Sequence, residues 1–275
     1  MTDNEKLLQC LGSIDLTTLH ESDTMETGRS FARNVNAFAQ AQPQLPNVAA
    51  ICVYPALVEA VRKTLTVPGV KIAAVGAGFP ASQTLPEVKA LECALCVDSG
   101  ADEVDIVLSL NRFLAGEYDL AAHEIQLVRT VMDKASADKA GRGGVPDDYR
   151  AHLKVILETG VLKSDEAIAR ASWLAMENGA DFIKTSTGKT AVSATPQAAR
   201  VMCGCIKSFY EKTGRKIGFK PAGGITTSAE ALVYRDIVDE VLGSEWLNPS
   251  LFRIGASRLA NNLLQDILHS DVAYF

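Results

Sequence analysis

Short runs of apolar and β-branched residues recur along the chain and predict eight β-strands. The runs lie at residues 14–19, 48–55, 71–79, 103–110, 153–160, 182–188, 217–224 and 252–257. Between them, apolar residues recur three and four positions apart, as in an amphipathic helix; examples are 86–100, 165–179 and 195–214. A strand and a helix repeat about every 34 residues, which predicts a parallel sheet with helical crossovers.

Eight strand–helix units can close on themselves, and we therefore expect a single-domain (β/α)8 TIM barrel over residues 1–275. A chain of about 250 residues is typical of that fold. The alternative is a doubly wound open sheet, but no GxGxxG segment opens a helix after the first predicted strand.

The composition argues against several classes of function. Lys and Arg number 27 against 33 Asp and Glu, so the net charge is −6 and the basic surplus of nucleic-acid-binding proteins is missing. The N-terminus carries no apolar signal segment, and no stretch reads as a membrane span. Six cysteines in a chain of this length indicate a reducing compartment rather than a disulfide framework. We expect a cytoplasmic protein without nucleic-acid or membrane partners.

Four predicted strands carry an ionisable residue at a position that faces the barrel axis. In the strand FIKTSTG, placing Ile183 outward against the helices points Lys184 inward. The same alternation points Lys154, Lys220 and Asp105 inward, each with apolar neighbours on the outside. Isolated buried charges are costly, so these groups are either paired or used in chemistry.

One interpretation of these charges is a purely structural ion-pair network. Its members would be Lys154, Lys184, Lys220, Asp15, Asp105 and Glu158. Such a network gains from alternating signs, whereas here three lysines occupy neighbouring strands, which lie about 4.8 Å apart. The clustering favours a reactive amine, and the structural network remains the alternative.

A nucleophilic lysine needs a lowered pKa, because only the neutral amine attacks a carbonyl and an ordinary lysine has a pKa of about 10.4. Lys184 lies between the other two lysines, and both positive charges should lower its pKa, so it is the best candidate for a Schiff base. Lys220 is the expected perturbing cation and proton carrier. Asp105 is the expected acid/base group across the barrel.

Small residues after the last three predicted strands indicate a phosphate site. They are Gly188-Lys189, Ala222-Gly223-Gly224 and Gly255-Ala256-Ser257. Barrels that bind phosphate esters commonly do so at this end, where backbone N–H groups and a helix N-terminus face the anion.

The other cysteines and the histidines are interpreted as structural. Cys93 and Cys96, like Cys203 and Cys205, fall on predicted helices without further ligands, so we expect no metal. Cys52 faces inward, where it either lines the pocket or is a buried, inert thiol. No histidine is expected at the C-terminal end of a strand, so imidazole catalysis has no support.

Several segments together closely resemble the deoxyribose-phosphate aldolase family of class I aldolases. They are DLTTL, GADEVDIV, LKVILETG, FIKTSTGK and GFKPAGG, and the resemblance runs from Asp15 to Ser257. It implies a TIM barrel that reversibly cleaves 2-deoxy-D-ribose 5-phosphate to acetaldehyde and D-glyceraldehyde 3-phosphate, without a metal or other cofactor, in deoxyribonucleoside catabolism. It implies Lys184 as the Schiff-base lysine, Lys220 as the lysine that lowers its pKa and relays protons, and Asp105 as the acid/base group.

The resemblance and the strand phases together give a set of expected substrate-binding residues. They are Asp15, Thr17, Cys52, Lys154, Gly188, Gly223, Gly224, Gly255 and Ser257. Two positions depart from the family pattern. Many members read GASS at the eighth strand, where this chain has Arg258, and some end in a functional tyrosine, where this chain has Phe275 after Tyr274.

Three functional interpretations follow. The first is the deoxyribose-phosphate lyase, and the second is another Schiff-base aldolase of a sugar phosphate that shares Lys184. The third is a non-catalytic barrel whose lysines bind a phosphorylated metabolite. A small sugar phosphate is the expected partner, and for the oligomeric state a homodimer is left open.

Overall fold

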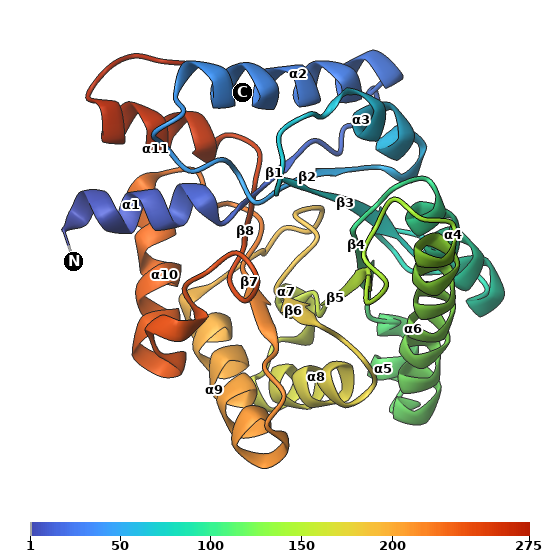
Figure 1. Ribbon diagram of the computed structural model, residues 1–275. Helices are drawn as coiled ribbons and strands as arrows, with labels where there is room; N and C mark the ends of the chain where they lie inside the picture. The colour runs from blue at the N-terminus through green and yellow to red at the C-terminus, as the bar shows by residue number, and fades with distance from the viewer. Residues whose placement is uncertain (1) are drawn as a thin grey trace.

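The computed structural model describes residues 2–275 and arranges eight parallel strands in a barrel surrounded by helices (Figure 1). The strands are β1 (Ile14–Thr17), β2 (Ala50–Val53), β3 (Lys71–Gly76), β4 (Glu103–Val107), β5 (His152–Ile156), β6 (Phe182–Lys184), β7 (Gly218–Lys220) and β8 (Ile254–Ala256). The strand order is β7-β6-β5-β4-β3-β2-β1-β8. Bridges from Phe219 to Phe252 and from Ala222 to Gly255 join β7 to β8 and close the barrel. The predicted (β/α)8 TIM barrel is confirmed.

Helix α1 precedes β1, the other helices follow strands, and the longer helices form the outer ring in Figure 1. They are α1 (Asp3–Gly12), α2 (Met25–Ala41), α3 (Val58–Thr64), α4 (Pro86–Asp98), α5 (Leu110–Leu114), α6 (Tyr118–Gly141), α7 (Thr159–Leu162), α8 (Asp165–Glu177), α9 (Pro196–Thr213), α10 (Ser228–Leu242) and α11 (Leu259–Leu268), with 3-10 turns η1 (Pro55–Leu57) and η2 (Ser244–Trp246). The three helices named from the sequence are confirmed as α4, α8 and α9. Within the described part of the chain, every helix is too short or too polar to cross a bilayer.

Local sequence signals explain where the helix α9 begins and ends. The side chain of Thr195 accepts a hydrogen bond from the backbone N–H of Ala198, and Pro196 occupies the first turn, where its missing N–H costs nothing. Gly214 ends the helix in the left-handed region, at a φ of 70°. The end of α9 thereby turns the chain back toward β7.

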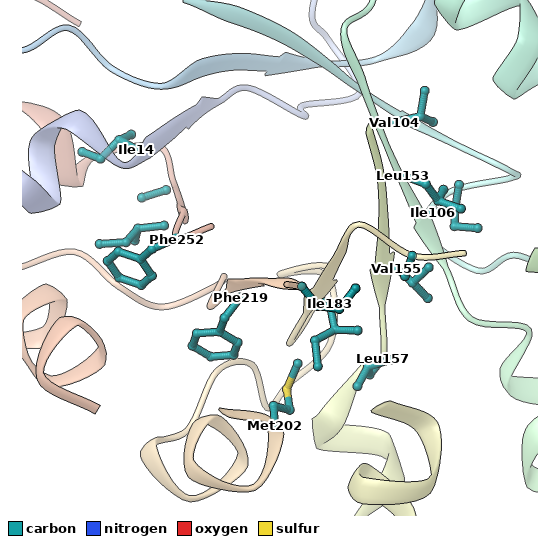
Figure 2. Close-up of a cluster of buried hydrophobic side chains, with 14 of the residues drawn as sticks. Ile14, Val104, Ile106, Leu153, Val155, Leu157, Ile183, Met202, Phe219 and Phe252 are labelled. Atoms are coloured by element: carbon teal, nitrogen blue, oxygen red, sulfur yellow. The ribbon is translucent and has the colours of Figure 1, made fainter. Parts of the chain in front are cut away.

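The outward faces of the strands form the main hydrophobic core, between the barrel and its helices. Ile183, Val155, Leu157, Phe219 and the side chains drawn with them in Figure 2 are buried in this layer. The predicted strand phase is therefore correct on β4, β5, β6 and β7. Because the outward positions are apolar, the polar residues of these strands point to the axis.

The interior of the barrel has an apolar side and a charged side. On β2 and β3 the inward residues Ala50, Cys52, Ala73 and Val75 form a small hydrophobic cluster with Leu19. On the other strands the inward residues are largely ionisable. An apolar wall lowers the local dielectric, so charges opposite it interact more strongly than they would in water.

The inward ring of Phe182 forms part of the floor of the charged side. Lys154 Nζ lies 6.0 Å and Arg253 Cζ 5.7 Å from its centroid. The ring fits because residue 218 is a glycine: a Cβ there would lie 2.2 Å from Phe182 Cε1. The sequence of β7 therefore controls the position of a side chain on β6.

We expect Gly218→Ala to destabilise the protein by about 1–3 kcal/mol, because the added methyl group must displace the Phe182 ring. Urea unfolding monitored by circular dichroism measures this loss. Gly204→Ala is the matched control, since nothing lies within 4 Å of its Cβ position on α9 and it should gain about 0.5–1 kcal/mol. Equal effects of the two substitutions would contradict the steric explanation.

Candidate active site

A cavity of about 250 Å³ opens at the C-terminal ends of the strands. Its walls come from the segments after β1, β6, β7 and β8, so segments far apart in the chain meet here. Seven of the predicted site residues line it: Thr17, Lys184, Gly188, Gly223, Gly224, Gly255 and Ser257. This is the end of the barrel at which TIM-barrel enzymes carry their active sites.

The three inward lysines converge on one carboxylate beneath this cavity. Asp105 Oδ2 accepts from Lys184 Nζ at 2.9 Å and from Lys220 Nζ at 2.7 Å, while Asp105 Oδ1 accepts from Lys154 Nζ at 2.9 Å. Lys184 and Lys220 are register partners on β6 and β7. Of the three lysines, only Lys184 lines the cavity; Lys154 and Lys220 are completely buried.

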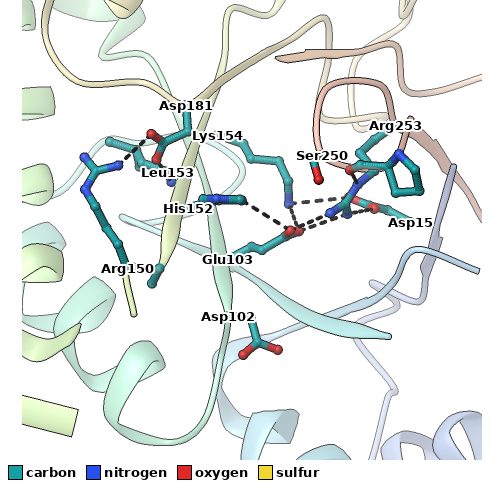
Figure 3. Close-up of polar contacts among 12 residues, drawn as sticks. Asp15, Asp102, Glu103, Arg150, His152, Leu153, Lys154, Asp181, Ser250 and Arg253 are labelled. Atoms are coloured by element: carbon teal, nitrogen blue, oxygen red, sulfur yellow. Dashed lines mark hydrogen bonds and ion pairs between the residues drawn. The ribbon is translucent and has the colours of Figure 1, made fainter. Parts of the chain in front are cut away.

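Figure 3 shows a second layer of charges, formed by Asp15, Glu103, Lys154 and Arg253. Asp15 pairs with Lys220 and lies 3.4 Å from Lys154 Nζ. Glu103 Oε2 lies 2.5 Å from Lys154 Nζ, and Arg253 contacts Asp15 Oδ1 and Glu103 Oε1, each at 2.6 Å. The barrel interior therefore holds four cations and three carboxylates in contact.

Lys184 is the one lysine of the three whose pKa lies below its ordinary value. Burial lowers the pKa of Lys184, and the ammonium of Lys220 lowers it further, against the opposing effect of Asp105. Burial also disfavours the charge of Lys220, but Asp105 and Asp15 raise the pKa of Lys220 above its usual range. The carboxylates likewise outweigh burial at Lys154 and raise its pKa. The arrangement selects Lys184 as the amine that loses its proton.

The structure corrects two expectations about the network. Glu158 is not a member: its carboxylate accepts hydrogen bonds from Thr187 and Thr190, in the segment after β6. From the sequence we also expected three like charges in a cluster instead of a network of alternating signs. This is wrong, because carboxylates from β1 and β4 lie between the lysines. Glu103 supplies the carboxylate that was expected from Glu158, and Arg253 adds a fourth cation; the sequence interpretation missed both.

Three predicted substrate-binding residues lie beneath the cavity rather than on its wall. Asp15, Cys52 and Lys154 are completely buried and do not line it. Burial raises the pKa of the Cys52 thiol, which packs in the apolar cluster of β2 and β3. Cys52 is therefore a buried thiol, as the second interpretation of this residue expected. Asp15 contacts Lys220 and Lys154 from below, and Lys154 contacts Asp105.

The glycine segments at the rim have the backbone geometry of an anion site. Gly188, Gly223 and Gly224 have φ values of 77°, 86° and 80°, a region that L side chains rarely adopt. Within residues 2–275, the backbone N–H of Gly224 has no hydrogen-bond partner, whereas Gly223 directly follows the bridge between Ala222 and Gly255. Successive amides in this conformation form a concave group of donors. Arg258 is exposed and does not line the cavity.

Residue 255 is a glycine because strand packing leaves no room for a side chain there. A Cβ at this position would lie 2.8 Å from Ala222 Cβ and 3.2 Å from Lys220 Cε. The missing side chain lets β8 approach β7 and the stem of Lys220 closely. The predicted site residue thus contributes to barrel closure as well as to the cavity wall.

Other residues at the cavity were missed or misplaced by the sequence interpretation. His20 lines the cavity from the loop three residues beyond the end of β1, although no histidine was expected at a strand end. Leu19 and Thr187 also line it, and Lys189 Nζ donates to Leu19 O at 2.6 Å. The signal for His20 was present, since it follows the predicted strand at 14–19 immediately.

The C-terminal tail lies against α2 and away from the cavity. The Tyr274 hydroxyl accepts from Gln42 Nε2 at 2.9 Å, and its ring packs edge-on against Phe38 at 5.2 Å. Phe275 packs against the same ring, and Asn261 binds the tail backbone. Because Gln42 follows the C-terminal end of α2, this contact lies at the opposite end of the barrel from the cavity.

The six cysteines are all free and buried, and those predicted on helices lie on α4 and α9. Among the residues that the structure describes, no group of three or more His, Cys, Asp or Glu is arranged to hold a metal ion.

A family model described as DeoC/LacD family aldolase matches residues 10–242. The chain belongs to this aldolase family. It is 40% identical over 273 residues to deoxyribose-phosphate aldolase of Mus musculus and, over the same length, to that of Homo sapiens; each match covers 96% of this chain and 81% of the relative. The solved structure of deoxyribose phosphate aldolase from Aeropyrum pernix, described as a unique tetramer, has a TM-score of 0.67 and 24% identity over 98% of both chains.

Membership of this aldolase family agrees with the observed geometry. An aldolase of this kind needs a carbonyl-activating group at the C-terminal face of a barrel. Lys184 is the one amine of the buried cluster that reaches the cavity.

Proposed function

We propose that this chain is a deoxyribose-phosphate aldolase. It would cleave 2-deoxy-D-ribose 5-phosphate reversibly to acetaldehyde and D-glyceraldehyde 3-phosphate, through a Schiff base on Lys184, in deoxyribonucleoside catabolism. The observation that carries the proposal is the amine of Lys184 on the cavity wall, with a lowered pKa and Asp105 at 2.9 Å. The 40% identity to relatives of that name supports the substrate.

The first step is attack of the neutral Lys184 amine on the aldehyde carbon of the open-chain sugar. The carbonyl oxygen takes up a proton and the nitrogen loses one, which gives the carbinolamine. Its hydroxyl group then takes up a second proton and leaves as water, which gives the iminium ion. Asp105 Oδ2 contacts both Lys184 and Lys220 and is placed to carry protons between them. This assigns Asp105 the acid/base role and Lys220 the relay role.

The second step breaks the bond between C2 and C3 of the sugar. Its electron pair moves toward the iminium nitrogen, the C3 hydroxyl loses its proton, and D-glyceraldehyde 3-phosphate leaves. The enamine that remains on Lys184 takes a proton at C2, and hydrolysis of the resulting imine releases acetaldehyde and the free amine. The sequence is redox-neutral overall and needs no external oxidant or reductant, and acid/base and nucleophilic side chains carry its steps.

The phosphate of the substrate is assigned to the glycine rim, where Gly223, the unpaired amide of Gly224 and the segment at Ser257 line the cavity. The buried Asp15 and Lys154 support the lysine cluster from below, and Thr17 lies on the cavity wall. Residues 1–275 would act as one aldolase domain. The cytoplasmic location and the homodimer remain predictions.

Gly224→Val is expected to lower kcat/KM for the phosphorylated sugar by about 10²-fold, because loss of the phosphate contact misplaces the carbonyl. Cleavage of unphosphorylated deoxyribose should be poor in both proteins and nearly unaffected. Steady-state kinetics on the two sugars provides the comparison.

Gly214→Val is the matched control for this substitution. Gly214 has a similar positive φ of 70° and open space around its Cβ, but it ends α9 at the other end of the barrel. The control should share the backbone strain and keep kcat/KM for the phosphorylated sugar. An equal loss on both sugars in Gly224→Val would place the phosphate elsewhere.

Substrate profiling separates this proposal from another sugar-phosphate aldolase with the same Schiff base. If 2-deoxy-D-ribose 5-phosphate is the substrate, its kcat/KM should exceed that of ketose phosphates. A preference for a ketose phosphate would favour the second interpretation.

A further inference from the structure

Arg253 and Glu103 form a buried pair at the end of the barrel opposite the cavity, beside Lys154 (Figure 3). Arg253 is 3% exposed and Glu103 1% exposed. The guanidinium donates to Glu103 Oε1 at 2.6 Å and to Asp15 Oδ1 at 2.6 Å, and Glu103 also holds Lys154 Nζ at 2.5 Å. Neither residue lines the cavity that contains Lys184.

The charges of the network do not balance. The cations are Lys154, Lys184, Lys220 and Arg253, and the carboxylates are Asp15, Glu103 and Asp105. Three cations neutralise three carboxylates, so one cation is in excess. A buried network is most stable when its net charge is zero, because an uncompensated buried charge is costly.

At moderate pH, only one of the four cations can release the proton whose loss makes the network neutral. A guanidinium does not deprotonate in proteins. Lys154 and Lys220 each touch at least two carboxylates, whereas Lys184 touches only Asp105 and lies at the cavity. Loss of a proton from Lys184 therefore neutralises the network at the lowest cost.

We propose that Arg253 is a positioning residue that makes Lys184 the surplus cation, and that the carboxylate of Glu103 acts in the opposite direction and favours the ammonium form of Lys184. This inference rests on the proposed function of Lys184. Without Arg253, three lysines face three carboxylates, and Lys184 is held as an ammonium ion. Without the charge of Glu103, the cation excess grows and Lys184 loses its proton more readily. With both charges removed, the original excess of one cation returns.

Other groups that face these residues are the same in every variant compared. Lys184 faces Asp105 from β4, Lys220 from β7 and Cys52 from β2. Glu103 also faces His152, whose Nδ1 lies 3.7 Å from Oε1.

The test compares the pH midpoint for trapping an acetaldehyde imine with cyanoborohydride, followed by intact-mass analysis. Arg253→Met should raise the midpoint by about one pH unit, and Glu103→Gln should lower it by a similar amount. The Glu103→Gln/Arg253→Met double variant should return to the parent midpoint. Arg253→Lys keeps the charge and should also match the parent.

A purely structural role for the pair predicts a different pattern. Loss of packing would lower the stability of Arg253→Met, Glu103→Gln and the double variant without moving their midpoints in opposite directions. Midpoints of Arg253→Met and Glu103→Gln that match the parent, or a double variant that stays with Arg253→Met, would overturn the charge assignment. If Arg253→Met does not fold, the charge assignment is tested by the other two single variants: Glu103→Gln should have a lower midpoint, and Arg253→Lys should keep the midpoint of the parent. A parent protein without an adduct would instead refute the proposed function, and this inference with it.

Discussion

Replacing Lys184 with Arg is expected to lower the rate of aldol cleavage by about 10⁴-fold or more. Arg keeps the positive charge beside Asp105 but does not form an imine, so the nucleophile is lost while the ion pair has a partner. The measurement is the rate of acetaldehyde release from 2-deoxy-D-ribose 5-phosphate at saturating substrate.

Lys207→Arg is the matched control, since Lys207 is exposed on α9 and the substitution makes the same chemical change outside the site. It should retain the parent rate. Circular dichroism of Lys184→Arg should match that of the parent. A folded Lys184→Arg protein with more than a trace of activity would remove the Schiff-base mechanism.

Lys220→Leu should lower activity at pH 7 by about 10²-fold, and part of that loss should return as the pH rises. The ammonium of Lys220 lowers the pKa of Lys184, so its removal raises that pKa. Fewer Lys184 side chains are then neutral at pH 7, and the neutral fraction increases with pH. The measurement is kcat between pH 6 and about pH 10.

Stability provides a second observable for this variant. Lys220 contacts Asp15 and Asp105, and leaving two buried carboxylates without this partner should cost about 3–5 kcal/mol. Lys220→Arg keeps a cation and should keep a pH profile of the parent's shape. If the residual activity of a folded Lys220→Leu protein follows the parent's profile, Lys220 is not the perturbing cation.

Alternation of apolar and ionisable residues predicted that Lys154, Lys184, Lys220 and Asp105 meet inside the barrel. Phe219 and Ile183 had to face the helices, which placed Lys220 and Lys184 on the axis. The same reasoning could have found Glu103, which lies two positions before Asp105 on β4 and therefore shares its inward face.

Other features depend on contacts that strand periodicity does not encode. Glu158 adopts a φ of 54° directly after β5, and this left-handed turn directs its carboxylate to Thr187 rather than to the lysines. Gly223 allows Ser193 to pack against it, since a Cβ there would lie 2.5 Å from Ser193 Oγ. Tyr274 is held by Gln42, 232 positions away in the chain. Each depends on loop or tail conformation, which single-sequence patterns describe poorly.

Borohydride reduction in the presence of acetaldehyde, followed by intact-mass analysis and peptide mapping, tests the proposed chemistry most directly. Reduction of an imine converts the amine into a stable ethylamine, so the account predicts one added ethyl group per chain, located on Lys184. The same treatment of Lys184→Arg should leave the mass unchanged. An unmodified parent protein, or an ethyl group on another lysine, would contradict the assignment of Lys184 as the Schiff-base residue.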